Sequence, residues 1–291
     1  IYGFLGPNGA GKSTTLNIMT GYLGATEGQV LIDGHDILKE PEEAKKNIGY
    51  LPEIPPLYME MTVREYLEFA AELKGIKKDK REPQIEEVIR LAKLRDVENR
   101  LIQNLSKGYK QRVGLAQAVL GFPEIIILDE PTVGLDPKQI IEIRELIRKL
   151  AKKHTVILSS HILAEVREVC DYIMIISGGK LVASDTTENL ENMMSGKGQI
   201  EVEAKASRDE MDHIIRRTGK IKEVKYRTSA SGITTAQIIA KGGEDIREEL
   251  FLAFSHAGVP MLTLNQSKTT LEEIFLELTQ GSGNRMIKEE K

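Results

Sequence analysis

The stretch "GPNGAGKST" (Gly6–Thr14) directly follows an apolar, strand-like run and directly precedes a helical segment. It matches the pattern G-x-x-x-x-G-K-S in the strand-to-helix context that this pattern requires. Its glycines allow backbone amides to approach a pyrophosphate closely, and Lys12 places a positive charge beside the terminal phosphates. A simple glycine turn between a strand and a helix would need neither Lys12 nor Ser13. The stretch therefore predicts a phosphate-binding loop in which Ser13 ligates Mg²⁺.

Apolar runs rich in β-branched residues predict buried parallel strands at four places along the chain. Helical patterns separate them, so we expect a doubly wound α/β fold, a parallel sheet of the P-loop NTPase type. A block from Met61 to Gly121 is almost wholly helical, and Thr62 with Glu65 predicts a capping box at its start. This block is interpreted as a helical subdomain. The four predicted strands are Ile1–Leu5, Ile125–Leu128, Thr155–Leu158 and Tyr172–Ile176.

The C-terminal part of the chain has a different pattern. Its order of strand, helix, strand, strand, helix, strand predicts a small α+β domain of the ferredoxin-like type. The strands are expected near 200–205, 222–228, 234–241 and 261–264, and the helices from 207 and over 245–257. We place the two domains at 1–192 and 199–280, with a linker at Met193–Gln199, a last helix at Thr270–Thr279 and a charged tail at 281–291.

Composition excludes several classes of protein. The net charge is -4, so there is no strongly basic field of the kind that attracts nucleic acid, and we expect no nucleic-acid partner. No apolar run approaches the roughly 18 residues of a spanning helix. The single Cys170 cannot form an internal disulfide and fits a reducing compartment. Because the chain begins inside a strand pattern without an initiator methionine, we expect it to be truncated there.

Candidate catalytic side chains follow the ends of two other predicted strands. Asp129 and Glu130 end the run "IIILDEP". We expect Asp129 to hold Mg²⁺, directly or through water, and Glu130 to orient or deprotonate the attacking water. The alternative, a solvated acidic turn before Pro131, is disfavoured by the buried strand. His161, in "ILSSH", opens a helix at the same sheet edge and could reach a γ-phosphate. Alone, it would be a first-turn histidine without a catalytic role.

The segment "LSKGYKQR" (Leu105–Arg112) completes a set of motifs that resembles the ATP-binding-cassette (ABC) transporter ATPases. That family has a signature, commonly L-S-G-G-Q, which Leu105, Ser106 and Gly108 match. Lys107 and Tyr109 differ from it at the third and fifth positions. The resemblance implies that this helix N-terminus, the Ser106 hydroxyl and the Gly108 amide hold the γ-phosphate of an ATP bound by the other subunit. It also implies ATP and Mg²⁺ as the cofactors.

Glu53 and Asp136 take their expected roles from the same resemblance. Glu53, in "YLPE", stands where the family usually has a glutamine that senses nucleotide and contacts the membrane subunit, and its carboxylate still offers an oxygen to Mg²⁺ or water. Asp136, in "GLD", is also typical of a helix N-cap before Pro137, which is compatible with a functional contact. The expected nucleotide-binding residues are Gly6, Pro7, Asn8, Gly9, Ala10, Gly11, Lys12, Ser13, Thr14, Glu53, Ser106, Gly108 and Asp136; the catalytic residues are Lys12, Glu130 and His161; and the metal ligands are Ser13, Asp129 and Glu53.

The resemblance covers about Ile1–Asn189, which corresponds to an ABC ATPase domain without its N-terminal strands and without the aromatic residue that stacks on adenine. It implies an ATP-hydrolysing subunit that forms a homodimer or heterodimer around two ATP molecules. This dimer would power export through separate integral membrane permease subunits from the cytoplasmic, inner face of the cell membrane. The segments "YLPEIPPLYMEMTVREYL" and "TLEEIFLEL" are similar to bacterial or archaeal single-cassette multidrug, sodium and gliding-type exporter ATPases.

Two other hypotheses stay open at this point. The chain could be a soluble regulatory ABC ATPase, or one associated with nucleic acid or ribosomes, that has no membrane partner. The short interval between Lys12 and Leu105 leaves no room for the coiled coils of DNA-repair relatives, and a single phosphate loop disfavours the fused two-cassette relatives. The chain could also bind nucleotide without hydrolysing it, although Glu130 and His161 argue against this.

Overall fold

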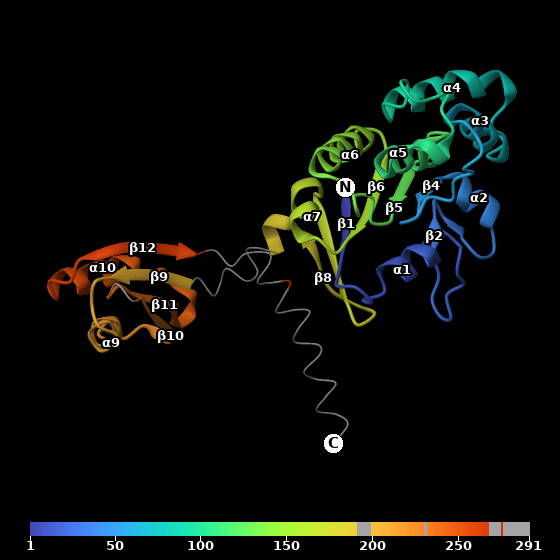
Figure 1. Ribbon diagram of the computed structural model, residues 1–291. Coiled ribbons are helices and arrows are strands. Elements are labelled where there is room, and N and C mark those ends of the chain that lie inside the picture. The colour runs from blue at the N-terminus through green and yellow to red at the C-terminus, as the bar shows by residue number, and fades with distance from the viewer. Residues whose placement is uncertain (191–198, 230–231, 268–274, 276–291) are drawn as a thin grey trace. The chain divides into compact units, whose positions relative to one another are not determined.

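The computed structural model describes residues 1–190, 199–229, 232–267 and 275, which belong to two compact units, Ile1–Asp185 and Thr186–Lys291 (Figure 1). The expected domain boundary and most of the linker Met193–Gln199 lie outside the described residues, although Gln199 begins a strand. The expected helix at Thr270–Thr279, except for Phe275, and the tail at 281–291 also lie outside them.

The first unit contains a six-stranded sheet whose strand order is β4-β5-β6-β1-β7-β8. The first five strands in this order pair in parallel, which confirms the expected α/β class. Their nearly continuous apolar sequences follow from burial on both faces of the sheet. A two-glycine turn, Gly178–Gly179, with positive φ at both residues, joins the last two strands as a hairpin. The strands are β1 (Tyr2–Leu5), β4 (Ile48–Leu51), β5 (Ile125–Leu128), β6 (Thr155–Ser160), β7 (Tyr172–Ser177) and β8 (Lys180–Thr186).

All four strands predicted for this unit are present, and β6 extends two residues further than expected, to Ser160. Strands β4 and β8 were not predicted, nor was the short hairpin of β2 (Leu31–Ile32) and β3 (His35–Asp36). The helices that accompany the sheet are α1 (Lys12–Met19), α2 (Pro41–Lys46), α6 (Pro137–Leu150) and α7 (Leu163–Val169), as Figure 1 shows.

The helical subdomain consists of α3 (Val63–Leu73), α4 (Lys78–Leu91), the 3₁₀ turn η1 (Ile102–Asn104) and α5 (Lys107–Val119). The capping box predicted at its start is confirmed, because Thr62 and Glu65 exchange side-chain to backbone hydrogen bonds. The Arg64 guanidinium joins α3 to α4 through Glu82 and Glu86. One face of α4 is buried at Ile85, Val88 and Ile89.

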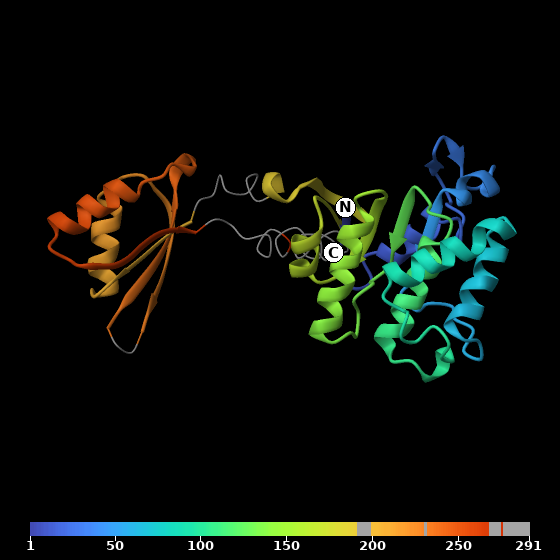
Figure 2. The same cartoon turned by 90° about the horizontal axis from the view of Figure 1, so that it is seen from above.

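The second unit has the predicted order of elements, which confirms the small α+β, ferredoxin-like domain. Its antiparallel sheet has the order β10-β11-β9-β12, and Figure 2 shows both helices on one face of it. Alternate strand residues such as Ile200, Val202 and Ile238 pack against Phe254 in its core. The elements are β9 (Gln199–Ala204), α9 (Arg208–Arg216), β10 (Ile221–Thr228), β11 (Thr234–Ala240), η2 (Lys241–Gly243), α10 (Arg247–His256) and β12 (Met261–Ser267).

The contact between β4 and α5 leads to a stability prediction. A Cβ added at Gly49 would lie 2.1 Å from the Ala118 carbonyl oxygen and 2.9 Å from Pro123 Cγ. Gly49→Ala should therefore push the backbones of β4 and α5 apart. We expect it to lower the free energy of unfolding by about 1–3 kcal/mol in urea denaturation, as overpacking does. Gly24→Ala is the matched control, because an added Cβ there meets no atom within 4 Å. Equal stability of the two variants would contradict this packing.

Candidate active site

The phosphate-binding loop joins β1 to α1 and is shaped by Gly9 and Gly11, whose φ angles are +78° and +102°. Only glycine adopts such left-handed conformations at little cost. The buried ammonium of Lys12 donates to the Gly6 carbonyl at 2.9 Å and to the Pro7 carbonyl at 3.4 Å. The lysine therefore folds back across its own loop, where its positive charge faces the site that the loop encloses.

Asp129 and Glu130 lie directly after β5, and both side chains are buried. The Glu130 Oε1 atom lies 3.4 Å from Lys12 Nζ, and its backbone has the left-handed φ of +46°. Ser159, on β6, contacts both acidic residues: its hydroxyl donates to Asp129 Oδ1 at 2.5 Å and accepts from the Glu130 amide at 2.9 Å. The strand arrangement thus brings the acidic pair to the loop, as expected.

His161 lies in the turn after β6, where its Nδ1 atom is 3.0 Å from Glu130 Oε2. The expectation that His161 opens a helix is wrong, because α7 begins at Leu163 and its N-cap residue is Ile162. The intervening turn is held by the Ser160 hydroxyl, which accepts from the Ile162 amide. The imidazole is partly exposed, so it can contact both the buried carboxylate and a ligand in the cavity.

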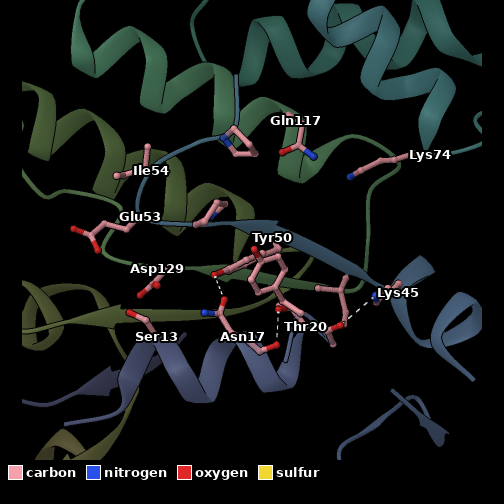
Figure 3. A pocket seen from close by; sticks show the side chains of 15 residues that line it. Ser13, Asn17, Thr20, Lys45, Tyr50, Glu53, Ile54, Lys74, Gln117 and Asp129 are labelled. Atoms are coloured by element: carbon pink, nitrogen blue, oxygen red, sulfur yellow. Dashed lines mark hydrogen bonds between the residues drawn. The ribbon is translucent and has the colours of Figure 1, made fainter. Parts of the chain in front are cut away.

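Two adjoining cavities show which of the expected residues come together. One, of about 420 Å³, is lined by most of the phosphate-binding loop together with Glu53, Glu130 and His161. The other, of about 830 Å³, shares Ser13 and Glu53 with it and is also lined by Asp129 (Figure 3). Glu53 is exposed at this junction. The loop, the acidic pair, His161 and Glu53 therefore surround one region.

Ser106, Gly108 and Asp136 do not line either cavity. The Ser106 hydroxyl caps α5 by accepting from the Tyr109 amide at 3.4 Å, and the N-cap predicted at Asp136 is confirmed by its bond from the Gln139 amide at 2.9 Å. Gly108 packs against Gln139, since a Cβ there would lie 2.5 Å from that side chain. The starts of α5 and α6 thus adjoin each other outside the cavities.

Sequence reasoning missed Ser159 and the pair of Tyr50 and Asn17. The Tyr50 hydroxyl, on β4, donates to Asn17 Oδ1 on α1 at 3.0 Å, next to Asp129 and Ser13 in the larger cavity (Figure 3). Burial and the nearby Asp129 charge raise the pKa of Tyr50 to about 12. The available signal for Ser159 was a polar residue near the end of an otherwise apolar strand, because buried hydroxyls need partners.

The geometry defines the class of protein. A cationic lysine and backbone amides can hold phosphates, a hydroxyl and a carboxylate provide the oxygen donors that suit Mg²⁺, and a second carboxylate can activate water. With this loop after β1 of a parallel sheet and the acidic pair after β5, the chain is a P-loop NTPase.

Comparisons with known proteins identify the family. Residues 1–133 match the family described as ABC transporter. The chain is similar to the bacitracin transport ATP-binding protein BcrA of Bacillus licheniformis, with 34% identity over 97% of this chain and 89% of that protein. The linearmycin resistance ATP-binding protein LnrL of Bacillus subtilis (strain 168) is 31% identical over 96% of this chain and 89% of that protein. The dimeric post-hydrolysis structure of the ATP-binding cassette MJ0796 bound to ADP and Pi has a TM-score of 0.58 and 29% identity, covering 64% of this chain and 84% of that chain. The chain therefore belongs to the ABC transporter family, as an ATP-binding subunit that hydrolyses ATP.

The tyrosine beside the site leads to a prediction about pH. Folding raises the pKa of Tyr50 from 10.0 to about 12, so the folded chain keeps a proton that the unfolded chain loses. Stability from this group should be fully present below pH 10 and be lost as the pH rises toward 12. We expect the unfolding free energy of the unmodified chain to fall relative to that of Tyr50→Phe over this window. Parallel pH curves in urea denaturation would contradict the assignment.

Proposed function

We propose that this ATP-binding subunit dimerises around two ATP molecules and drives export through separate membrane subunits. One observation carries the proposal. Within one chain, the capped start of α5 at Ser106 and Gly108 lies outside the cavity at Lys12. A second copy can bring its own α5 N-terminus to the exposed side of the bound triphosphate, where the helix dipole favours negative charge. The dimeric cassette bound to ADP and Pi supports this arrangement.

Nucleotide binding is assigned to the loop from Gly6 to Thr14, with Lys12 beside the β- and γ-phosphates. Ser13 and Asp129 would hold Mg²⁺, with Glu53 contributing directly or through water, because hydroxyl and carboxylate oxygens are the donors that this ion prefers. When bound, the ion supplies positive charge that offsets the charge developing on the phosphates. Asp136, at the adjoining start of α6, is assigned a nucleotide contact at the same dimer interface.

Catalysis is assigned to Glu130 as the group that orients or deprotonates water, with His161 as its partner. In the structure, Glu130 is held between Lys12 and His161. An arriving γ-phosphate competes for Lys12, since the ammonium of a lysine is a strong partner for phosphate. This exchange would release Glu130 toward water while His161 remains hydrogen-bonded to it and contacts the phosphate.

The membrane partner is proposed to dock at the larger cavity. The exposed apolar side chains of Tyr22 and Ile54 line it, which suits a protein contact. None of the helices in the described part of the chain is long and apolar enough to span a bilayer. Because the relatives are ATP-binding proteins named for transport and resistance, we place the subunit at the cytoplasmic, inner face of the membrane, as a homodimer or heterodimer beneath separate permease subunits. The relatives named for bacitracin transport and linearmycin resistance support export, whereas they lend no support to a ribosome- or DNA-associated role.

The assignment of Glu130 predicts a trapped state. Glu130→Gln should slow phosphate release from ATP by about 10²–10⁴-fold, the usual contribution of a general base, while a nucleotide-bound dimer accumulates in size-exclusion chromatography. Glu124→Gln, the same change at the opposite end of β5, should leave both unchanged. Lys12→Ala should abolish tight ATP binding and therefore the dimer. Hydrolysis by Glu130→Gln at the unmodified rate would show that another group activates water.

The docking assignment predicts which surface substitution separates the subunit from its partner. Ile54 is 83% exposed beside the larger cavity, so Ile54→Asp should reduce copurification with an integral membrane subunit from detergent extracts. We expect a loss of roughly tenfold or more, since apolar interface anchors contribute about 2 kcal/mol. Leu31→Asp, at an exposed position on β2 outside the cavity lining, is the control. Copurification with ribosomes or DNA alone would overturn the transport proposal.

A further inference from the structure

Ser159 is the one hydroxyl that the described residues place against both members of the acidic pair. Its side chain is fully buried near the end of β6. The Oγ atom donates to Asp129 Oδ1 at 2.5 Å and accepts from the Glu130 amide at 2.9 Å. A hydroxyl has one proton to donate, so donating it to the carboxylate fixes the direction of this chain of hydrogen bonds from the Glu130 amide, through Ser159, to Asp129.

The bond from the Glu130 amide stabilises an unfavourable backbone conformation. Glu130 has a φ of +46°, in the left-handed region that is unfavourable for a residue with a Cβ. This conformation turns the chain sharply after Asp129, so that Glu130 reaches Lys12 while Asp129 lines the cavity shared with Ser13. Without the Ser159 hydroxyl the buried Glu130 amide would lose its acceptor, and a buried amide without a partner is destabilising.

The bond to Asp129 restricts the other carboxylate. A hydrogen bond to an ionised oxygen is shorter and stronger than one between neutral groups, and this one occupies Oδ1 inside the protein. It fixes the rotation of the carboxylate and leaves the remaining oxygen for other partners. Groups of this kind, which orient a metal ligand without touching the metal, commonly change metal affinity when they are removed.

We propose that Ser159 is a positioning residue that aligns Asp129 for the metal ion and Glu130 for water through a single hydroxyl. This inference rests on the proposed roles of Asp129 and Glu130 and adds the group that sets their mutual geometry. Ser159 makes the strength of Mg²⁺ binding and the placement of the water-activating carboxylate depend on the same hydrogen-bonded unit.

Ser160 provides a matched control on the same strand. It is equally buried, but its hydroxyl donates to Glu165 Oε2 at 3.2 Å and accepts from the Ile162 amide at 3.0 Å. It contacts neither Asp129 nor Glu130 in the structure. The variants Ser159→Ala and Ser160→Ala therefore delete the same atom at neighbouring buried positions, and they differ in whether the acidic pair loses a partner.

The test measures the dissociation constant of ATP by calorimetry with and without Mg²⁺, in the whole chain. We expect Ser159→Ala to reduce the affinity gained from Mg²⁺ by about 10–100-fold, the usual effect of losing a group that orients a metal ligand, while affinity without Mg²⁺ is unchanged. Ser160→Ala should keep the full gain even where its stability falls. Urea denaturation of both variants establishes whether each is folded. If Ser159→Ala does not fold, Ser159→Cys takes its place, because a thiol is similar in size to the hydroxyl but is a weaker hydrogen-bond donor.

The outcomes separate this proposal from the function on which it rests. If both alanine variants lose the same share of the ATP affinity gained from Mg²⁺, or if Ser159→Ala loses none of it, the role of Ser159 is wrong while the proposed function stands. An unmodified chain that binds ATP equally with and without Mg²⁺ would overturn the metal assignment of Ser13 and Asp129, and the Ser159 role with it. A selective loss in Ser159→Ala, accompanied by slower hydrolysis, would support the proposal.

Discussion

The buried contact between Lys12 and Glu130 is the interaction on which the site depends. Both side chains are almost fully enclosed and lie 3.4 Å apart. A buried charge without a partner is very costly, so each group requires the other as long as no phosphate is present. In the proposed mechanism, an arriving triphosphate offers Lys12 a stronger partner and so breaks this pair. His161 then remains as the contact of Glu130.

The parallel sheet makes this contact possible. Parallel strands direct their carboxyl ends to one edge, and the order β5-β6-β1 places three strand ends next to one another. Consequently, the phosphate-binding loop after β1, the acidic pair after β5 and His161 after β6 meet there. The helical subdomain adds a different surface, in which the capped start of α5 adjoins that of α6 through Gly108 and Gln139. Because this surface is separate from the cavity, the proposed nucleotide site takes its two halves from two chains.

The departures from the common ABC pattern fit the geometry of these two surfaces. Lys107, at the third position of the signature, has its ammonium close to Gly134 in the turn before α6, where an added Cβ would lie 2.2 Å from Nζ. It therefore contributes positive charge beside the adjoining helix starts without displacing Ser106 or Gly108. Glu53 is exposed where the two cavities meet, which is where its proposed contacts with nucleotide and with a protein partner require it to lie.

Features that depend on neighbours along the chain could be predicted from the amino-acid sequence: the phosphate-binding loop, the apolar strands, the capping box at Thr62 and the order of elements in the second unit. Strand β4, which contains Gly49, and strand β8, which has mixed polarity, were missed because their pairing partners, rather than their composition, make them strands. The contacts of Ser159 with Asp129 and Glu130, and that of His161 with Glu130, could be seen only in the folded chain. These contacts connect residues 29 to 31 positions apart, and the crossovers of the sheet, rather than any local propensity, bring them together.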